Sequence, residues 1–344
     1  VSVGKGANSV AGNTVLGESA LDASVSGGNN TAIGKDALTA LTSGAQNVAV
    51  GSLALDANTT GGLNVAVGHG AIGACTTGGN NIGIGRLALR SITTHENNVA
   101  IGMNALINST ASDNTGVGSE VLSSNTNGTN NVAVGKHALK ANTTGTQNTA
   151  VGTFTLDSNT TANNNTALGH SGLGDNTTGA DNTAVGVNAL LRNTTASNNT
   201  AVGKDSLLLN TTGADNVAVG SAALDANTTG SNNVGVGRSS GGSVTTASQL
   251  TLVGANSGLL ITSGSDNTAF GYDSLRACTT GIQNTALGRS ALASLITGQF
   301  NVAVGQSTLF NTTASNNTGI GYSALFANTT GNSNVAVGTE SLKN

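Results

Sequence analysis

A five-residue pattern of polar, apolar and small side chains recurs along the whole chain. Residues 182–186, Asn-Thr-Ala-Val-Gly, return 17 residues later as residues 199–203. Counted from the last glycine of each copy, position −3 is always β-branched and position −1 is always apolar. Position −2 between them is nearly always Ala or Gly. This alternation predicts a short β-strand at positions −3 to −1 of every repeat.

The period of the pattern is 17 residues, and it holds from Gly17 to Gly338. Two repeats have 16 residues, and in both we expect the missing residue to fall in a loop just before the turn that begins at Asn108 or Asn311, so that the strands keep phase. A partial copy, VSVG, ends at Gly4. A short, regular period predicts stacked repeats, here called rungs, in place of separate globular domains. The fold class is therefore all-β, a parallel β-solenoid of about twenty 17-residue rungs, in one continuous domain over residues 1–344.

The small residue at position −2 predicts close packing on one side of each strand. We expect Thr183 and Val185 to pack inward and Ala184 to face away, toward a second backbone that a neighbouring chain supplies. The alternative is that the local turn geometry restricts this position to small residues, without a neighbouring chain. The alanines predicted to pack between chains are Ala49, Ala66, Ala133, Ala184, Ala201 and Ala218.

Three further positions complete the predicted rung. Position +4 is aliphatic in all rungs except those with Gly241 and Gly258, which indicates a second inward side chain. Position +7 exchanges Asn, as at Asn193, for residues such as Ile92, so we expect it to be buried, with its asparagines bonded in a ladder. Asn at position −4 is expected to hold a turn or to stack likewise. Glycines at positions 0 and +10 are consistent with tight corners, although Ala162 at +10 shows that a positive φ is not required there.

The repeated phrases NTAVG, NVAVG at 64–68 and NIGIG at 81–85 resemble the head repeats of trimeric autotransporter adhesins. They resemble still more closely the NTAVG…AL…NTTG repeats of phage tail-fibre-like proteins, over about residues 13–344. The resemblance implies a left-handed parallel β-roll, three chains around one axis and a passive extracellular fibre. Bacterial and phage origin both stay open.

Residues 238–266 keep the period but lose the phrases, since both rungs lack Leu at +4 and Leu250 replaces the Asn. We expect drift or a local repacking there, with a bend or a docking site for another part as alternatives. Val1 and Asn344 both fall inside a repeat, which favours a fragment of a longer fibre.

The amino-acid composition argues against several classes of function. Charged residues make up 8% of the chain and the net charge is −4, which gives no electrostatic basis for binding nucleic acid or an anionic membrane. No apolar run is long enough to insert into a membrane. Cys75 and Cys278 are separated by twelve rungs, about 58 Å at roughly 4.8 Å per rung, so no disulfide between them is expected.

No constellation of catalytic, metal-ligating or cofactor-binding residues is expected, so we predict that the chain is not an enzyme. The four histidines occupy different positions of the repeat, except that His69 and His170 share one, about 29 Å apart at roughly 4.8 Å per rung. The aspartates form no calcium-binding loop. The irregular rungs hold no His, Asp or Glu before Asp266.

Six of the seven aromatic residues lie in the last quarter of the chain. Four occupy corner positions where charges stand in other rungs, so we expect them to be exposed and able to contact a receptor. Drift, or an interface with a following domain, is the alternative. The residues predicted to contact a receptor are Tyr272, Phe310, Tyr322 and Phe326.

The hypothesis that follows is a structural and adhesive fibre segment, a spacer that contacts a host glycan or protein receptor. We expect a homotrimer, outside the cell, in a virion tail fibre or on a bacterial cell surface. The alternative is an ice-binding protein that uses stacked threonines. Those threonines are Thr60, Thr77, Thr94, Thr144 and Thr161.

Overall fold

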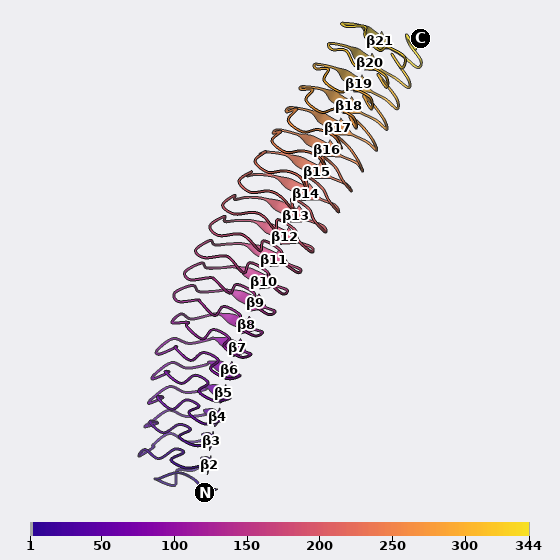
Figure 1. The fold of residues 1–344 in the computed structure, drawn as a ribbon. Helices are drawn as coiled ribbons and strands as arrows, with labels where there is room; N and C mark the ends of the chain where they lie inside the picture. Colours follow the sequence, from indigo (N-terminus) through magenta and orange to yellow (C-terminus); the bar gives the residue numbers. More distant parts are fainter. Residues whose placement is uncertain (1–2, 344) are drawn as a thin grey trace. The chain divides into compact units, whose positions relative to one another are not determined.

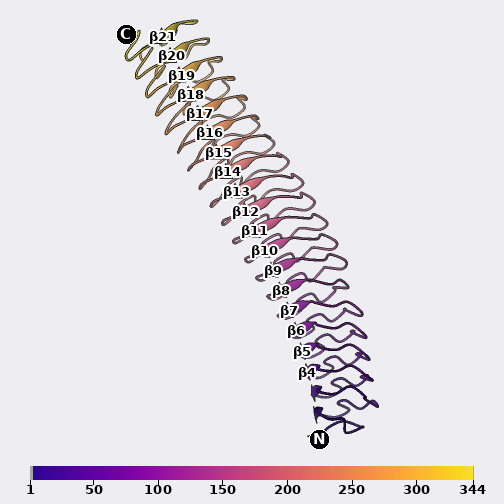
Figure 2. The same ribbon diagram turned by 180° about the vertical axis from the view of Figure 1, so that it is seen from behind.

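The computed structural model describes residues 3–343 and contains short strands joined by turns (Figures 1 and 2). The chain divides into two compact units, residues 1–168 and 169–344, and each is described by itself. In both figures the strand arrows of each unit lie one above another. The first unit contains β1 (Val3–Gly4), β2 (Thr14–Leu16), β3 (Thr31–Ile33), β4 (Val48–Val50), β5 (Val65–Val67), β6 (Ile82–Ile84), β7 (Val99–Ile101), β8 (Thr115–Val117), β9 (Val132–Val134), β10 (Thr149–Val151) and β11 (Thr166–Leu168). The second contains β12 (Thr183–Val185), β13 (Thr200–Val202), β14 (Val217–Val219), β15 (Val234–Val236), β16 (Thr251–Val253), β17 (Thr268–Phe270), β18 (Thr285–Leu287), β19 (Val302–Val304), β20 (Thr318–Ile320) and β21 (Val335–Val337).

Within each unit, successive strands from β2 to β11 and from β12 to β21 pair in parallel, each one rung from the next. The register keeps equivalent positions opposite each other, as in Ala184 opposite Ala201. The short rungs keep the same register, so that β7 pairs with β8 and β19 with β20 without a slip. The predicted parallel β-solenoid with rungs of about 17 residues is confirmed. The prediction of a single continuous domain stays a prediction.

Two details of the repeat differ from expectation. Strand β1 runs antiparallel to β2, so Val3 and Gly4 do not continue the parallel stack; the first two residues of the partial copy VSVG lie outside the described residues. In the short rungs, Ser109 and Thr312 take the buried place of position +7, so the missing residue falls in the turn after them. The prediction that the missing residue falls just before Asn108 and Asn311 is therefore wrong, although it does fall in a turn.

The orientation predicted for the strands is wrong. The residue at position −2 is buried in every strand from β2 to β21, whereas positions −3 and −1 are half-buried or exposed. Ala184 has no exposed surface, and Val202 at position −1 is 36% exposed. The reason is the narrow interior of the rung. At Gly83, a Cβ atom would lie 2.6 Å from Cγ1 of Ile72, so only the smallest side chains fit between the two walls.

The alanines predicted to pack between chains lie inside the chain itself. Each of them is completely buried within a single copy of the protein. The close backbone that their small size indicated is the opposite wall of the same solenoid. They are therefore core residues and cannot contact a second chain. The corrected residues are Ala49, Ala66, Ala133, Ala184, Ala201 and Ala218.

The other predicted core positions are confirmed. Leu190 at +4 and Asn193 at +7 are completely buried. Asn193 donates a hydrogen bond from Nδ2 to Oδ1 of Asn176 in the preceding rung, at 2.9 Å. At position −4, Asn199 donates from its backbone N–H to Oδ1 of Asn182, at 3.0 Å. These ladders supply the buried amides with the partners that burial requires.

The irregular rungs are a local repacking of the core. Leu252 stands at position −2, where other rungs carry Ala or Gly, and it is completely buried. It fills the space that Gly241 and Gly258 leave at position +4. A Cβ atom on Gly241 would lie 2.9 Å from Cδ1 of Leu252, and one on Gly258 would lie 2.8 Å from its Cδ2. One large side chain thus replaces two, and both glycines retain the left-handed φ of that position, 61° and 59°.

Candidate functional site

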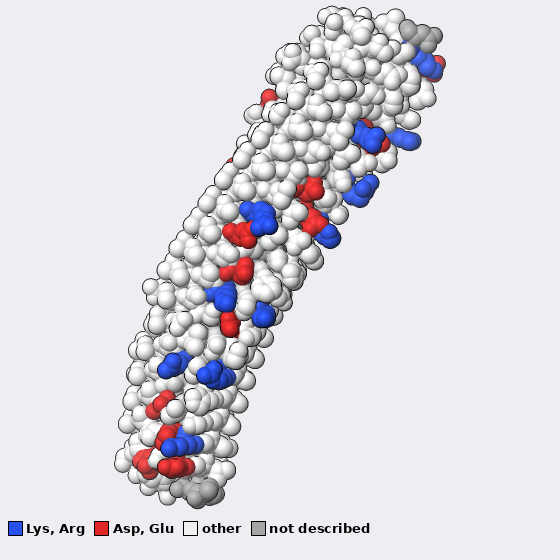
Figure 3. Space-filling model, viewed as in Figure 1, with Lys and Arg blue, Asp and Glu red and all other residues white. Residues whose placement is uncertain are grey.

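The turn after each glycine corner carries most of the charged side chains of the molecule. On the face drawn in Figure 3 they lie in scattered patches with uncharged surface between them. Several form ion pairs between neighbouring rungs, such as Lys140 with Glu120 at 3.0 Å and Arg192 with Asp175 at 2.9 Å. The bond from Lys140 is the main reason that the pKa of Glu120 lies below its usual range. Exposed pairs of this kind contribute little to stability.

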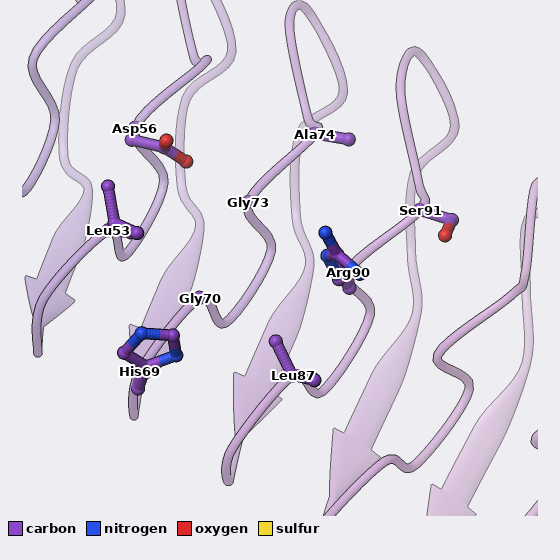
Figure 4. A pocket seen from close by; sticks show the side chains of 9 residues that line it. All are labelled: Leu53, Asp56, His69, Gly70, Gly73, Ala74, Leu87, Arg90 and Ser91. Carbon is purple, nitrogen blue, oxygen red and sulfur yellow. The ribbon is translucent and has the colours of Figure 1, made fainter.

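A hollow of about 500 Å³ interrupts this surface in the first unit. We call it the notch. It arises because one rung has glycine at two positions where its neighbours have side chains. Gly70 lies between Leu53 and Leu87, and Gly73 lies between Asp56 and Arg90 (Figure 4). The remaining residues that line the notch are His69, Ala74 and Ser91.

The two charges of the notch are not joined to each other. Among residues 3–343 no ion pair involves Asp56 or Arg90. Burial raises the pKa of the Asp56 carboxyl, against the opposing effects of hydrogen bonds from its own backbone N–H and that of Ala57. Nearby Asp36 raises this pKa further and Arg90 lowers it. A half-buried carboxylate and an exposed guanidinium therefore face the same hollow with unused hydrogen-bonding capacity.

The aromatic residues named for receptor contact lie in the second unit, in two separate places. Tyr272 is 49% exposed, and the guanidinium of Arg289 lies 5.9 Å from the centre of its ring. Tyr322 is 50% exposed. Phe310 and Phe326 are half-buried and stack on each other, with 5.3 Å between ring centres and 11° between planes. Exposure is thus confirmed for the two tyrosines, whereas the two phenylalanines cover each other.

The outward positions of the strands form an uncharged surface, apolar at position −1 and Thr, Val or Ile at position −3. No charged residue occupies position −3 or −1 of strands β2 to β21, and position −1 is Val, Ile, Leu or Phe in each. We call these two columns the strand face. Its large apolar side chains that are at least 36% exposed are Leu16, Ile84, Ile101, Val132, Val134 and Leu168 in the first unit, and Val202, Val219, Phe270, Leu287, Ile320, Val335 and Val337 in the second.

The cysteines belong to the core. Cys75 and Cys278 are buried, free thiols at position +7. Burial raises the pKa of each thiol to about 11, so both stay protonated near neutral pH and are poor nucleophiles. Each lies against the backbone oxygen of the corner three residues later, as Cys75 Sγ does at 3.4 Å from Gly78 O.

The described residues provide neither a cluster of metal ligands nor a membrane-spanning helix. Between residues 3 and 343, no three His, Cys, Asp or Glu side chains come close enough together to ligate one metal ion. Over the same residues, no helix has the length and apolar character needed to cross a bilayer.

The notch and the strand face were both missed by reasoning from the sequence. A signal for the notch was present, since Gly70 is the only glycine at position +2 in the rungs counted from Gly17 to Gly338, and the same rung also has a glycine, Gly73, at position +5. The strand face was missed because its β-branched residues were assigned to the core. Comparison with protein-family models finds no model that matches the sequence, and a search of curated proteins finds no match.

Proposed function

We propose that the chain is a structural segment of an extracellular homotrimeric fibre, in a virion tail fibre or a bacterial surface adhesin. The observation that carries this proposal is the strand face. A column of exposed aliphatic side chains without one charge is unusual on a soluble monomer, and such patches commonly mark interfaces. The resemblance of the repeats to adhesin heads and tail fibres supports the choice of three copies and of an extracellular location.

The size of the strand face fits an interface. Each unit contributes two outward columns over ten strands. If each of these side chains exposes roughly 50 Å², one unit presents about 1,000 Å², against the ~800 Å² per partner of a standard interface. The partner is a second copy because rungs of the same chain have the same spacing, so two strand faces can interdigitate along their length.

A passive role as spacer and contact surface agrees with the rest of the molecule. Dense backbone bonding between rungs makes a stiff stack, and the exposed Tyr272 and Tyr322 supply candidate contacts for a host glycan or protein. The half-buried Phe310 and Phe326 present one joined apolar patch to the same kind of partner.

Sedimentation equilibrium of the purified chain tests this proposal. Three copies of a 33.3 kDa chain make a particle of about 100 kDa, and we expect it to resist heat and protease. If the chain is a stable monomer over the micromolar range, the proposed trimer is wrong, and the proposed trimeric fibre is wrong as well.

A second candidate, ice binding, is favoured by a different observation. Position +9 carries an exposed threonine in many rungs, which sets hydroxyl groups one rung apart. Thermal hysteresis of the purified chain tests it, and absence of hysteresis at millimolar concentration would end this candidate. The threonines first named for it are all exposed: Thr60, Thr77, Thr94, Thr144 and Thr161.

A further inference from the structure

The notch of the first unit has the features of a small-molecule site. It is a hollow of about 500 Å³, within the size range of ligand pockets, and its walls are chemically distinct. Leu53 and Leu87 form an apolar wall on either side of Gly70. Asp56 and Arg90 form a polar wall on either side of Gly73. No neighbouring side chain fills the gap between the two charges.

The spacing of the charges sets the size of a ligand. Asp56, Gly73 and Arg90 occupy the same position on three successive rungs, so Asp56 and Arg90 are two rungs apart, about 9.6 Å at roughly 4.8 Å per rung. A six-membered ring with one substituent group spans such a gap once both side chains reach inward.

The chemistry of each wall indicates the groups that a ligand presents. The Arg90 guanidinium offers several N–H donors in one plane, the arrangement that binds a carboxylate through two bonds. The Asp56 carboxylate only accepts, and it already accepts from two backbone N–H groups, so its free lone pairs suit hydroxyl donors. One arginine opposite a carboxylate disfavours a phosphate, whose second charge would be repelled.

We propose that the notch binds a hydroxylated organic acid of monosaccharide size, a sugar acid, with its carboxylate on Arg90 and its hydroxyls on Asp56. The carbon face of the ring lies against Leu53 and Leu87, and His69 also lines the notch. This site is independent of the trimer, since its residues lie in the turn and not on the strand face.

A second place in the chain offers an internal comparison. In the second unit, Gly242 follows Asp225 in the same position of the repeat, and a Cβ atom on Gly242 would lie 3.5 Å from Oδ1 of Asp225. Burial raises the pKa of Asp225 as it does that of Asp56. The next rung, however, carries Leu259 where Arg90 stands in the notch. Only the first unit therefore pairs this carboxylate with a cation across the glycine.

Saturation-transfer difference NMR of the full chain, with D-glucuronate as the probe, tests the proposal. We expect transfer to glucuronate, at least tenfold weaker apparent affinity in Arg90→Gln, and a similar loss in Gly73→Leu, which fills the hollow. Leu191 and Leu208 occupy the same position of the repeat as Gly73, so the filled variant has native precedent. The matched controls are Arg276→Gln and Gly242→Leu, which should leave binding unchanged.

The comparison probes decide the class of ligand. D-Glucose, which lacks the carboxylate, should bind at least tenfold more weakly, and so should cyclohexanecarboxylate, which lacks hydroxyl groups. Equal binding of cyclohexanecarboxylate would overturn the assignment to a sugar acid. Absence of transfer at 10 mM glucuronate, or transfer that persists undiminished in Arg90→Gln, would overturn the site itself, whether or not Gly73→Leu folds.

Discussion

At the scale of single residues, the backbone conformation explains the residue types at positions of the repeat that the hydrophobic pattern does not account for. Three residues in a typical rung adopt left-handed φ angles without being glycine, for example Asn188 at 57°, Leu190 at 53° and Asn198 at 61°. This conformation costs a residue with a Cβ atom about 1 kcal/mol or more. At Leu190 the cost is offset by complete burial of a large side chain. The fold therefore accepts local strain in order to direct a leucine into a narrow core.

The glycine at position 0 is required for two reasons. Gly203 has a φ of 135°, which only glycine adopts readily, and a Cβ atom there would lie 2.5 Å from the carbonyl oxygen of Gly220. We expect Gly203→Ala to lower the free energy of unfolding by about 3 kcal/mol or more, measured by denaturant titration.

The matched control for Gly203→Ala is Gly213→Ala, at position +10. A Cβ atom on Gly213 would lie 2.2 Å from the carbonyl oxygen of Gly230, so the turn must shift to accept it, but φ is not left-handed there and Ala162, Ala196 and Ala247 occupy that position natively. This substitution should therefore cost less than Gly203→Ala. Equal losses in the two variants would show that the φ angle at position 0 is not what constrains the glycine.

At the scale of the rung, the core behaves as a fixed volume that different residues share. In a typical rung, a leucine at position +4 packs against an alanine at position −2. Where Ile72 stands at +4, Gly83 replaces the alanine, because a Cβ atom would meet the branched side chain at 2.6 Å. Where Gly241 and Gly258 stand at position +4 in place of leucine, the side chain of Leu252 fills the space that the two leucines would occupy. Interior packing density is thereby maintained even in rungs whose sequence departs from the repeat.

This exchange predicts a compensation between substitutions. Leu252→Ala should leave a cavity between two rungs that have no leucine and cost about 3 to 5 kcal/mol in the free energy of unfolding. Adding Gly241→Leu and Gly258→Leu to Leu252→Ala restores the typical arrangement and should recover most of that loss. Denaturant titration of the single and triple variants measures this, and a triple variant no more stable than the single one would contradict shared packing.

At the scale of the whole molecule, the proposed trimer depends on the strand face and not on the alanine columns. The alanines are buried in the core of the single chain, whereas the apolar side chains at position −1 face outward and are half-buried or exposed. Exposed apolar columns of this extent favour association, and the absence of charge on them removes the repulsion that would oppose it.

Charges introduced on the strand face should dissociate the trimer. We expect Val202→Lys combined with Val219→Lys to give monomers in sedimentation equilibrium, because lysines buried between chains would lack partners. Thr178→Lys combined with Thr212→Lys places two charges at the exposed position +9 of the same unit and should leave three copies together. A trimer that survives the valine substitutions with unchanged affinity would place the interface elsewhere. Circular dichroism checks that both variants keep their β-structure.

The sequence by itself determined the period, the positions of the strands, the buried leucine and asparagine positions, and the parallel stacking. It could do so because each depends on residue type at a fixed place, repeated about twenty times. Which face of the strand points inward was decided only by the tertiary structure. Alternate residues such as Thr183, Ala184 and Val185 define two faces without saying which is the core, and the width of the interior makes the choice. The notch likewise depends on three rungs meeting in space, since Asp56, Gly73 and Arg90 become neighbours only when the rungs stack.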